Sequence, residues 1–133
     1  MQTSKGFSLI ELLVILAIAG IVGVIGLPIY KRYEFRITHT DAVAGVMMAH
    51  NTLEKCASAA GGIYDGCDAG FPILSPKNSY SISVVLGAPP ATTYTITATR
   101  ARPDPGETCG NYTLNELGQR GITFGNVQDC WIQ

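Results

Sequence analysis

The chain has 133 residues, a formal net charge of -1, 47 % hydrophobic residues and only 14 % charged residues. This length allows one domain with an appendage, and the balanced charge excludes a globally basic surface that would attract nucleic acid. Soluble domains usually contain about a quarter charged residues. The deficit lies at one end, because residues 12–30 contain no Asp, Glu, Lys, Arg or His. The chain therefore consists of an apolar segment and a polar remainder.

The apolar segment follows directly after six residues, MQTSKG, which include Lys5. The segment is longer than the roughly 7–15 apolar residues of a cleaved secretory signal and close to the roughly 20 that span a bilayer. It therefore predicts a retained, single membrane-spanning helix with Lys5 on the cytoplasmic side. Pro28 removes one backbone donor, so we expect a kink or a locally melted turn just before it.

An amphipathic helix is predicted to continue beyond Pro28. Apolar residues recur there at steps of three and four, typical of one buried helical face. They are Phe35, Val43, Val46, Met47, Ala49, Leu53, Cys56 and Ala57. We expect one helix from about Phe7 to about Ala59, half in lipid and half packed on a domain, with Gly61 and Gly62 ending it.

The remaining chain predicts an antiparallel sheet. Residues 61–79 are rich in Gly, Pro, Asp, Asn and Ser without a sustained period, which indicates a loop. Alternation over residues 80–86 and 93–99 predicts a hairpin across the turn GAPPA. A third strand at 112–116 and a short fourth strand near Ile122 complete a roughly four-stranded sheet. The predicted fold class is α+β, with the amphipathic half of the helix covering the sheet.

The chain contains four cysteines, Cys56, Cys67, Cys109 and Cys130. They lack the close CxxC pairs of a zinc site or a thioredoxin-like redox centre. Their even number, beside an export-type segment, favours two disulfides formed in an oxidising compartment. The sequence alone leaves all three pairings open.

Catalysis has no candidate residues. His39 and His50 lie eleven residues apart on the predicted helix, too far along its axis to bind one metal ion, so we expect surface or groove histidines. No GxSxG, HExxH or phosphate-cradling glycine loop occurs in the sequence. We therefore predict no enzyme activity, no metal and no cofactor.

The segment KGFSLIEL, residues 5–12, closely resembles the class III signal of type IV prepilins. The resemblance implies that prepilin peptidase cuts between Gly6 and Phe7 and methylates the new amine of Phe7. It also implies that Glu11 meets the terminal amine of a neighbouring subunit during assembly. A charged side chain at the centre of a membrane helix costs roughly 2.5–3.5 kcal/mol on insertion scales, less near the interface, so Glu11 needs such a partner.

The likeness extends unevenly over the whole chain. Residues 94–99, 109–114 and the final Cys130-Trp131 resemble the C-terminal signature of PilE-like pilins and minor pilins. In that family the last two cysteines close a loop, which implies a Cys109–Cys130 bridge and leaves Cys56 with Cys67. The implied architecture is the type IV pilin fold, with a leader (1–6), a transmembrane or filament-core half of the helix (7–30) and a periplasmic or extracellular head domain (31–133).

The resemblance implies a structural subunit, major or minor, of a type IV pilus that serves adhesion, twitching motility or DNA uptake. Its expected partners are other pilin subunits, prepilin peptidase and the inner-membrane assembly machinery. It would lie in the inner membrane before assembly and in an extracellular filament afterwards. A pseudopilin of a type II secretion system is the alternative, because it shares the leader and the helix.

A DNA-binding minor pilin is a further alternative. Arg100 and Arg102 flank the end of one predicted strand, and Arg120 lies by another turn, so the three arginines could form a small basic patch. Asp104 and Glu107 lie beside them in the sequence and weaken it. Scattered, solvated charges are the competing interpretation, since phosphate binding usually requires several clustered cations.

Overall fold

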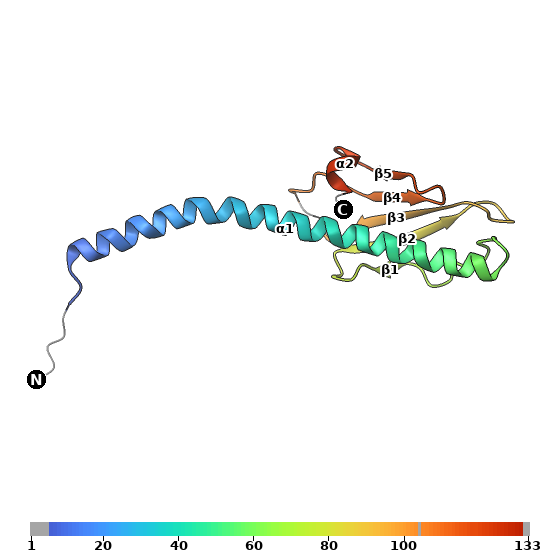
Figure 1. Cartoon of the computed structure of the whole chain (residues 1–133), viewed down its shortest axis with the longest axis horizontal. Helices are drawn as coiled ribbons and strands as arrows, with labels where there is room; N and C mark the ends of the chain where they lie inside the picture. The colour runs from blue at the N-terminus through green and yellow to red at the C-terminus, as the bar shows by residue number, and fades with distance from the viewer. Residues whose placement is uncertain (1–5, 104, 132–133) are drawn as a thin grey trace, which may run out of the picture. The chain divides into compact units, whose positions relative to one another are not determined.

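The computed structural model describes residues 6–103 and 105–131 (Figure 1). In chain order, the elements are helix α1 (Leu9–Ala59), strands β1 (Ile73–Leu74), β2 (Tyr80–Leu86), β3 (Tyr94–Arg100), β4 (Tyr112–Asn115) and β5 (Arg120–Ile122), and helix α2 (Val127–Cys130). The chain separates into two units, residues 1–36 and residues 37–133. The predicted α+β fold class is confirmed.

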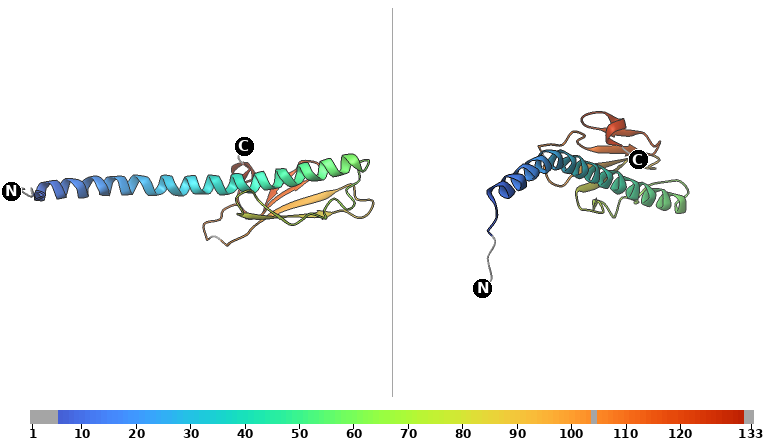
Figure 2. Two further views of the ribbon diagram at one scale, coloured as in Figure 1. Left: turned by 90° about the horizontal axis from the view of Figure 1, so that it is seen from below. Right: turned by 60° about the vertical axis from the view of Figure 1, so that its left-hand side comes forward.

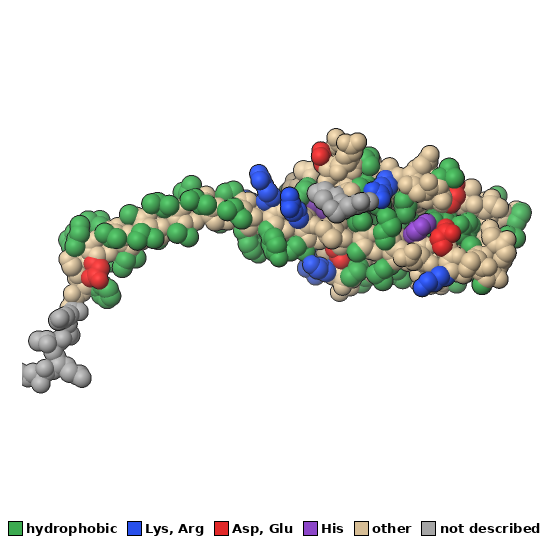
Figure 3. Space-filling view, viewed as in Figure 1, with side chains coloured by type: hydrophobic (Ala, Val, Ile, Leu, Met, Phe, Trp, Pro, Cys, Tyr) green, Lys and Arg blue, Asp and Glu red, His purple; other side chains and the backbone are tan. Residues whose placement is uncertain are grey.

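The described part of the first unit consists mainly of the apolar half of α1, which ends at residue 30 and is followed by the charged residues of 31–36. Figure 3 shows hydrophobic side chains along this apolar half, with an acidic side chain near its start and basic side chains after its end. Every described residue from Gly6 to Glu34 is exposed in the single chain, and α1 is long and apolar enough to cross a membrane by length and composition. A helix that is apolar all round requires lipid or other helices as its surroundings.

Helix α1 begins at Leu9, two residues later than expected, and runs without interruption through Pro28. The expectation of a melted turn before Pro28 is therefore wrong for this structure, while a kink there stays a prediction. At the other end, Gly61 and Gly62 adopt φ values of 73° and 91°. The Gly62 N–H donates to the Ala57 carbonyl at 2.7 Å, closing the helix with a glycine cap as predicted.

In the second unit, the rest of α1 lies across one face of the sheet (Figure 2). Its buried apolar residues follow helical spacing and are mostly small: Ala42, Val46, Ala49, Leu53 and Ala57. Small side chains allow the helix to approach the strands closely. The approach is tightest at Gly45, where an added Cβ would lie 2.8 Å from Cδ1 of Ile82 and 3.1 Å from Cβ of Ser75. Any larger residue at this position would therefore force Ile82 or Ser75 to shift.

The sheet is antiparallel with the strand order β1-β2-β3-β4-β5, so each strand pairs with its neighbour in sequence. The register places Tyr80 opposite Arg100 between β2 and β3, and Ile96 opposite Leu114 between β3 and β4. Residues on alternate positions form the core beneath the helix: Tyr80, Ile82, Tyr94, Ile96, Ala98, Tyr112 and Leu114. The predicted hairpin and the two later strands are confirmed.

Two short elements differ from the prediction. The sheet has a fifth strand, β1, whose residues Ile73 and Leu74 pair with Ile82 and Ser81 inside the segment predicted to be a loop. A strand of two residues is too short to show alternation, which is why the sequence pattern does not reveal it. Helix α2, four residues long, is also not predicted; the Asn126 side chain caps it by accepting from the Gln128 N–H.

Two disulfides tie the second unit together. Cys56 is bonded to Cys67, with Cα atoms 5.8 Å apart, and Cys109 is bonded to Cys130, with Cα atoms 5.9 Å apart. The first joins the end of α1 to the loop after it. The second closes a loop that contains β4, β5 and α2. Loops of this size stabilise the folded chain by about 3 kcal/mol each in the chain-entropy account.

Candidate functional site

The residues of the prepilin-like signal lie at the start of α1. Gly6 and Phe7 precede the helix and are exposed, with Phe7 79 % accessible. Lys5 lies outside the described residues. Helical hydrogen bonding begins with the Leu12 N–H, which donates to the Ser8 carbonyl at 3.1 Å. Gly6 and Phe7 are thus outside the helix and accessible, as the cut site of a peptidase must be.

Glu11 lies in the first turn of α1 and is exposed. The unpaired N–H groups of a helix start give it partial positive charge, which favours a carboxylate at this position. Its neighbours in the sequence, Ile10 and Leu12, are apolar and exposed as well. A negative charge therefore stands inside an otherwise apolar surface, where a cation from another chain would be strongly attracted.

The second unit contains a polar groove of about 530 Å³. Its lining residues come from α1, from the β1–β2 turn and from the end of β3: Thr38, Lys77, Asn78, Ser79, Arg100, Arg102 and Pro103. Three cationic side chains thus converge from segments more than twenty residues apart. The pairing of Tyr80 with Arg100 explains this, because it brings the β1–β2 turn beside the end of β3. We call these lining residues the basic groove.

Arg120, the third arginine of the predicted patch, does not line the basic groove. It lies on β5, where its guanidinium carbon is 5.3 Å from the ring centroid of Trp131. Trp131 in turn donates from its indole N–H to the Gly121 carbonyl at 3.1 Å. Arg120 therefore contributes a cation–π contact to the C-terminal loop. Lys77, which the sequence did not single out, takes its place beside Arg100 and Arg102.

A buried carboxylate fixes the turn that carries Lys77. Asp41 of α1 is 3 % exposed and accepts hydrogen bonds from Ser75 Oγ, from the Lys77 N–H at 2.8 Å and from the Ser79 N–H at 3.3 Å. Asn78, at the tip of this turn, has a φ of 58°, a left-handed conformation that Asn tolerates better than most residues. Asp41 thus anchors the β1–β2 turn to the helix.

The positive charge of Arg100 is partly neutralised by Glu107, whose carboxylate accepts a hydrogen bond from the Arg100 guanidinium. Burial opposes ionisation of Glu107, but hydrogen bonds from the Cys109 N–H and from Arg100 outweigh it and lower the pKa of this carboxyl. Lys77 and Arg102 are both exposed. The positive charge that the basic groove offers to a ligand therefore comes mainly from Lys77 and Arg102.

The expectation that both histidines lie on the surface or in a groove is wrong for His39. This residue is 2 % exposed, and its Nδ1 is hydrogen-bonded to the Tyr112 hydroxyl. Burial lowers the pKa of His39 and raises that of Tyr112. His50 is half-buried and contacts the Tyr94 hydroxyl at 2.5 Å. Both imidazoles face the sheet, where each forms a hydrogen bond with a tyrosine hydroxyl, and this contact with the sheet covers them.

The donor atoms of His39, Glu107 and Cys109 lie within 4.8 Å of one another, as metal ligands do. However, the sulfur of Cys109 is bonded to that of Cys130 and has no thiolate to offer. The carboxylate of Glu107 already accepts from Arg100, from the Tyr80 hydroxyl at 3.2 Å and from backbone N–H groups. The cluster is a hydrogen-bonded part of the core, and its donor set does not fit a metal ion.

Comparison with known proteins agrees with these features. Residues 1–27 match the family of the prokaryotic N-terminal methylation motif. Residues 28–113 match a family described as type IV minor pilin ComP, DNA uptake sequence receptor. Among individual proteins, the chain is 33 % identical over 86 residues to prepilin peptidase-dependent protein D of Escherichia coli (strain K12).

That alignment covers 64 % of this chain and 58 % of the relative, so the chain spans little more than half of that protein's length. The minor pilin match covers most of the chain and extends across α1 and the sheet as far as β4. The long apolar helix, the antiparallel sheet and the C-terminal disulfide are the features of the type IV pilin fold. The chain therefore belongs to the ComP family of type IV minor pilins.

Proposed function

We propose that the chain is cut between Gly6 and Phe7 by prepilin peptidase, is methylated at Phe7, and enters a type IV filament as a minor subunit. The observation that carries this proposal is the methylation motif followed by an apolar helix that is exposed on all sides. Residues 7–30 would lie in the membrane before assembly and in the filament core afterwards. Residues 31–133 would form the outer head. The role is structural, and we assign it no catalytic step.

Glu11 would direct assembly through the terminal amine of a neighbouring subunit, which exists only after cleavage. We expect Glu11→Gln to be processed normally but to remain in the membrane fraction, because the neutral side chain does not attract that amine. Quantitative mass spectrometry of sheared filaments and of membranes measures the distribution. Glu34→Gln, on the same helix beyond the apolar segment, is the matched control and should enter filaments. Normal incorporation of Glu11→Gln would refute this role.

We also propose that the head binds DNA through the basic groove. The family is described as a DNA uptake sequence receptor, and the groove brings Lys77 and Arg102 together with the polar side chains of Asn78 and Ser79. Cationic and hydroxyl or amide side chains are the groups that contact DNA phosphates. The small net charge of the chain means that any such binding depends on this local cluster.

Fluorescence anisotropy of labelled duplex DNA with the full chain in detergent, over a range of salt concentrations, tests this second function. For Lys77→Ala/Arg102→Ala we expect weaker binding and a salt slope smaller by about 0.9 for each phosphate that the variant no longer neutralises. Lys55→Ala/Arg120→Ala removes the same charge outside the groove and should bind like the unmodified chain. Equally weakened binding in both variants would mean that the groove is not the DNA site.

A further inference from the structure

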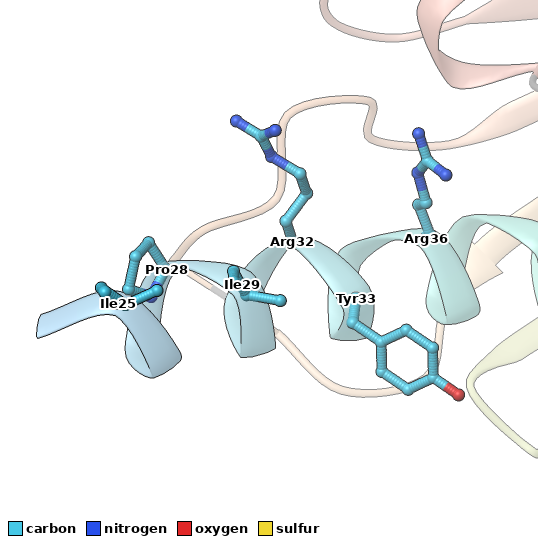
Figure 4. Close-up of a pocket in the computed structure, with 6 residues that line it drawn as sticks. All are labelled: Ile25, Pro28, Ile29, Arg32, Tyr33 and Arg36. Atoms are coloured by element: carbon cyan, nitrogen blue, oxygen red, sulfur yellow. The ribbon is translucent and has the colours of Figure 1, made fainter. Parts of the chain in front are cut away.

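A second groove, of about 580 Å³, lies on α1 where its apolar half ends (Figure 4). It is lined by Ile25, Pro28, Ile29, Arg32, Tyr33 and Arg36, all within the first unit of the chain. Neither the processing proposal nor the DNA proposal assigns a ligand to these residues. The groove combines an apolar half with a cationic half, and this division suggests the kind of ligand it would take.

The two arginines extend to the same side of the helix in Figure 4, whereas Tyr33 points away from them. Arg32 and Arg36 are four residues apart, which places neighbouring side chains on one helical face. Both are exposed. Two guanidinium groups on one face of a helix can donate to the same phosphate, and the planar fork of N–H donors favours arginine over lysine for this ligand.

The apolar half of the groove continues the same face toward the N-terminus. Ile25 and Ile29 precede Arg32 by seven and three residues, so the three side chains lie nearly in line along the helix. Ile25 and Ile29 are 57 % and 63 % exposed. A ligand that fills the whole groove would therefore need an anionic group joined to a hydrocarbon chain that runs along the helix axis.

The depth of the groove in a membrane agrees with this ligand. Residues 12–30, which lack charged side chains, span roughly 28 Å as a helix, close to the roughly 30 Å thickness of a bilayer's hydrocarbon core. Arg32 and Arg36 then lie at the level of the lipid headgroups, and Ile25 and Ile29 lie among the acyl chains. Tyrosines such as Tyr30 and Tyr33 are typical of this interface.

We propose that this groove is a binding site for an anionic phospholipid, with the phosphate held by Arg32 and Arg36 and an acyl chain packed along Ile25, Pro28 and Ile29. The bound lipid would hold the subunit at a defined depth until it is extracted for assembly. The proposal rests on membrane anchoring before assembly, which the methylation motif and the apolar helix support. It is independent of the proposed roles of Glu11 and of the basic groove.

Native mass spectrometry of the full chain, released from detergent micelles that contain equal amounts of phosphatidylglycerol and phosphatidylcholine, tests the site. We expect retained phosphatidylglycerol to exceed phosphatidylcholine by roughly fivefold for each arginine that contacts the phosphate. Arg32→Gln/Arg36→Gln should abolish this preference. Lys55→Gln/Arg120→Gln removes the same charge from the second unit, and this variant should retain the preference for phosphatidylglycerol. The mass of each variant also reports whether both disulfides have formed, which verifies that the head is folded.

Three results would overturn the proposal. Equal retention of the two lipids would show that the groove has no preference for anionic headgroups. A preference that persists in Arg32→Gln/Arg36→Gln would place the lipid elsewhere on the chain. Displacement of phosphatidylglycerol by an equal concentration of inorganic phosphate would show a general phosphate site, because the acyl chain would then contribute nothing. Filament incorporation and DNA binding are not involved in any of these readouts.

Discussion

Asp41 is a buried carboxylate whose hydrogen-bond donors lie in the segment that joins β1 to β2. It accepts hydrogen bonds from Ser75 Oγ and from the N–H groups of Lys77 and Ser79. Ser75 Oγ in turn accepts from the Tyr80 N–H at 2.9 Å, at the start of β2. One side chain on α1 therefore determines both the turn that carries Lys77 and the entry to the central hairpin.

We predict that Asp41→Ala lowers the free energy of unfolding by about 3 kcal/mol, because it leaves buried donors without an acceptor. Denaturant unfolding of the oxidised full chain in detergent, followed by the fluorescence of Trp131, the single tryptophan, measures this decrease. Asp68→Ala, at an exposed loop position, is the control and should change stability by less than about 0.5 kcal/mol. Equal effects of the two substitutions would contradict the anchoring role of Asp41.

His39 is a buried imidazole surrounded by titratable groups. It faces the Tyr112 hydroxyl from β4, Arg100 from β3 and the carboxylate of Glu107, 4.0 Å from its Nε2. Burial lowers its pKa from the ordinary 6.5; Glu107 opposes this shift and Arg100 adds to it. As the pH falls through 6.5, the unfolded chain therefore takes up a proton that the folded chain excludes. The free energy of unfolding then decreases until the pH reaches the lowered pKa of the folded state.

We predict that the stability of the unmodified chain decreases as the pH falls below about 7, and that His39→Gln flattens this decrease. The pKa of Glu107 is lowered from 4.5, so its own contribution disappears only below that pH and does not mask the effect. Thermal unfolding at a series of pH values provides the measurement. His50→Gln serves as the control and should retain the decrease; a His39→Gln profile parallel to that of the unmodified chain would refute the assignment.

At the scale of elements, close contact between α1 and the sheet depends on the small residues of the helix. Gly45 lies between Ile82 of β2 and Ser75, and Asp41 holds Ser75 in place one helical turn away. The helix and the hairpin therefore cannot separate locally without breaking the Asp41 hydrogen bonds. A larger side chain at Gly45 must displace either the strand or this polar anchor.

We predict that Gly45→Val lowers the free energy of unfolding by about 2 kcal/mol through overpacking against β2. Met48→Val places the same side chain at an exposed position on the same helix, where no overpacking is expected. Denaturant unfolding of both variants gives the difference. If Gly45→Val is no less stable than Met48→Val, the close approach of helix and sheet is not what requires glycine here.

The sequence reveals the long elements and misses the short ones for a physical reason. The periods of the helix and of the β2–β3 hairpin extend over enough residues to be recognised, whereas β1 and α2 have two and four residues. The burial of His39 could have been predicted from the sequence. It precedes Ala42, Val46 and Ala49 at steps of three and four, so it shares the apolar face of the helix.

The basic groove could be predicted only in part from the sequence. Arg100 and Arg102 are close together in the sequence and could be grouped from it, but Lys77 joins them only through the register of β2 with β3. Arg120 is drawn away by its contact with Trp131, which depends on the closed C-terminal loop. Strand register and loop closure are tertiary properties, so a patch that depends on them cannot be derived from spacing alone.

At the scale of the whole molecule, a membrane-anchored precursor would be converted into a processed minor pilin. The first unit presents the exposed residues Gly6 and Phe7, between which we propose cleavage, and an apolar helix, and the second unit is disulfide-bonded. In this proposal, removal of residues 1–6 would create the amine that Glu11 attracts, so processing would precede assembly. The anionic lipid site would serve the precursor and the processed subunit alike until extraction.

The intact mass of the protein, isolated from cells with and without prepilin peptidase, tests this conversion most directly. We predict a peptidase-dependent removal of residues 1–6, the addition of one methyl group at Phe7, and the absence of four hydrogens because of the two disulfides. The same unprocessed mass in both strains would contradict the conversion and would leave an anchored domain that does not enter a filament.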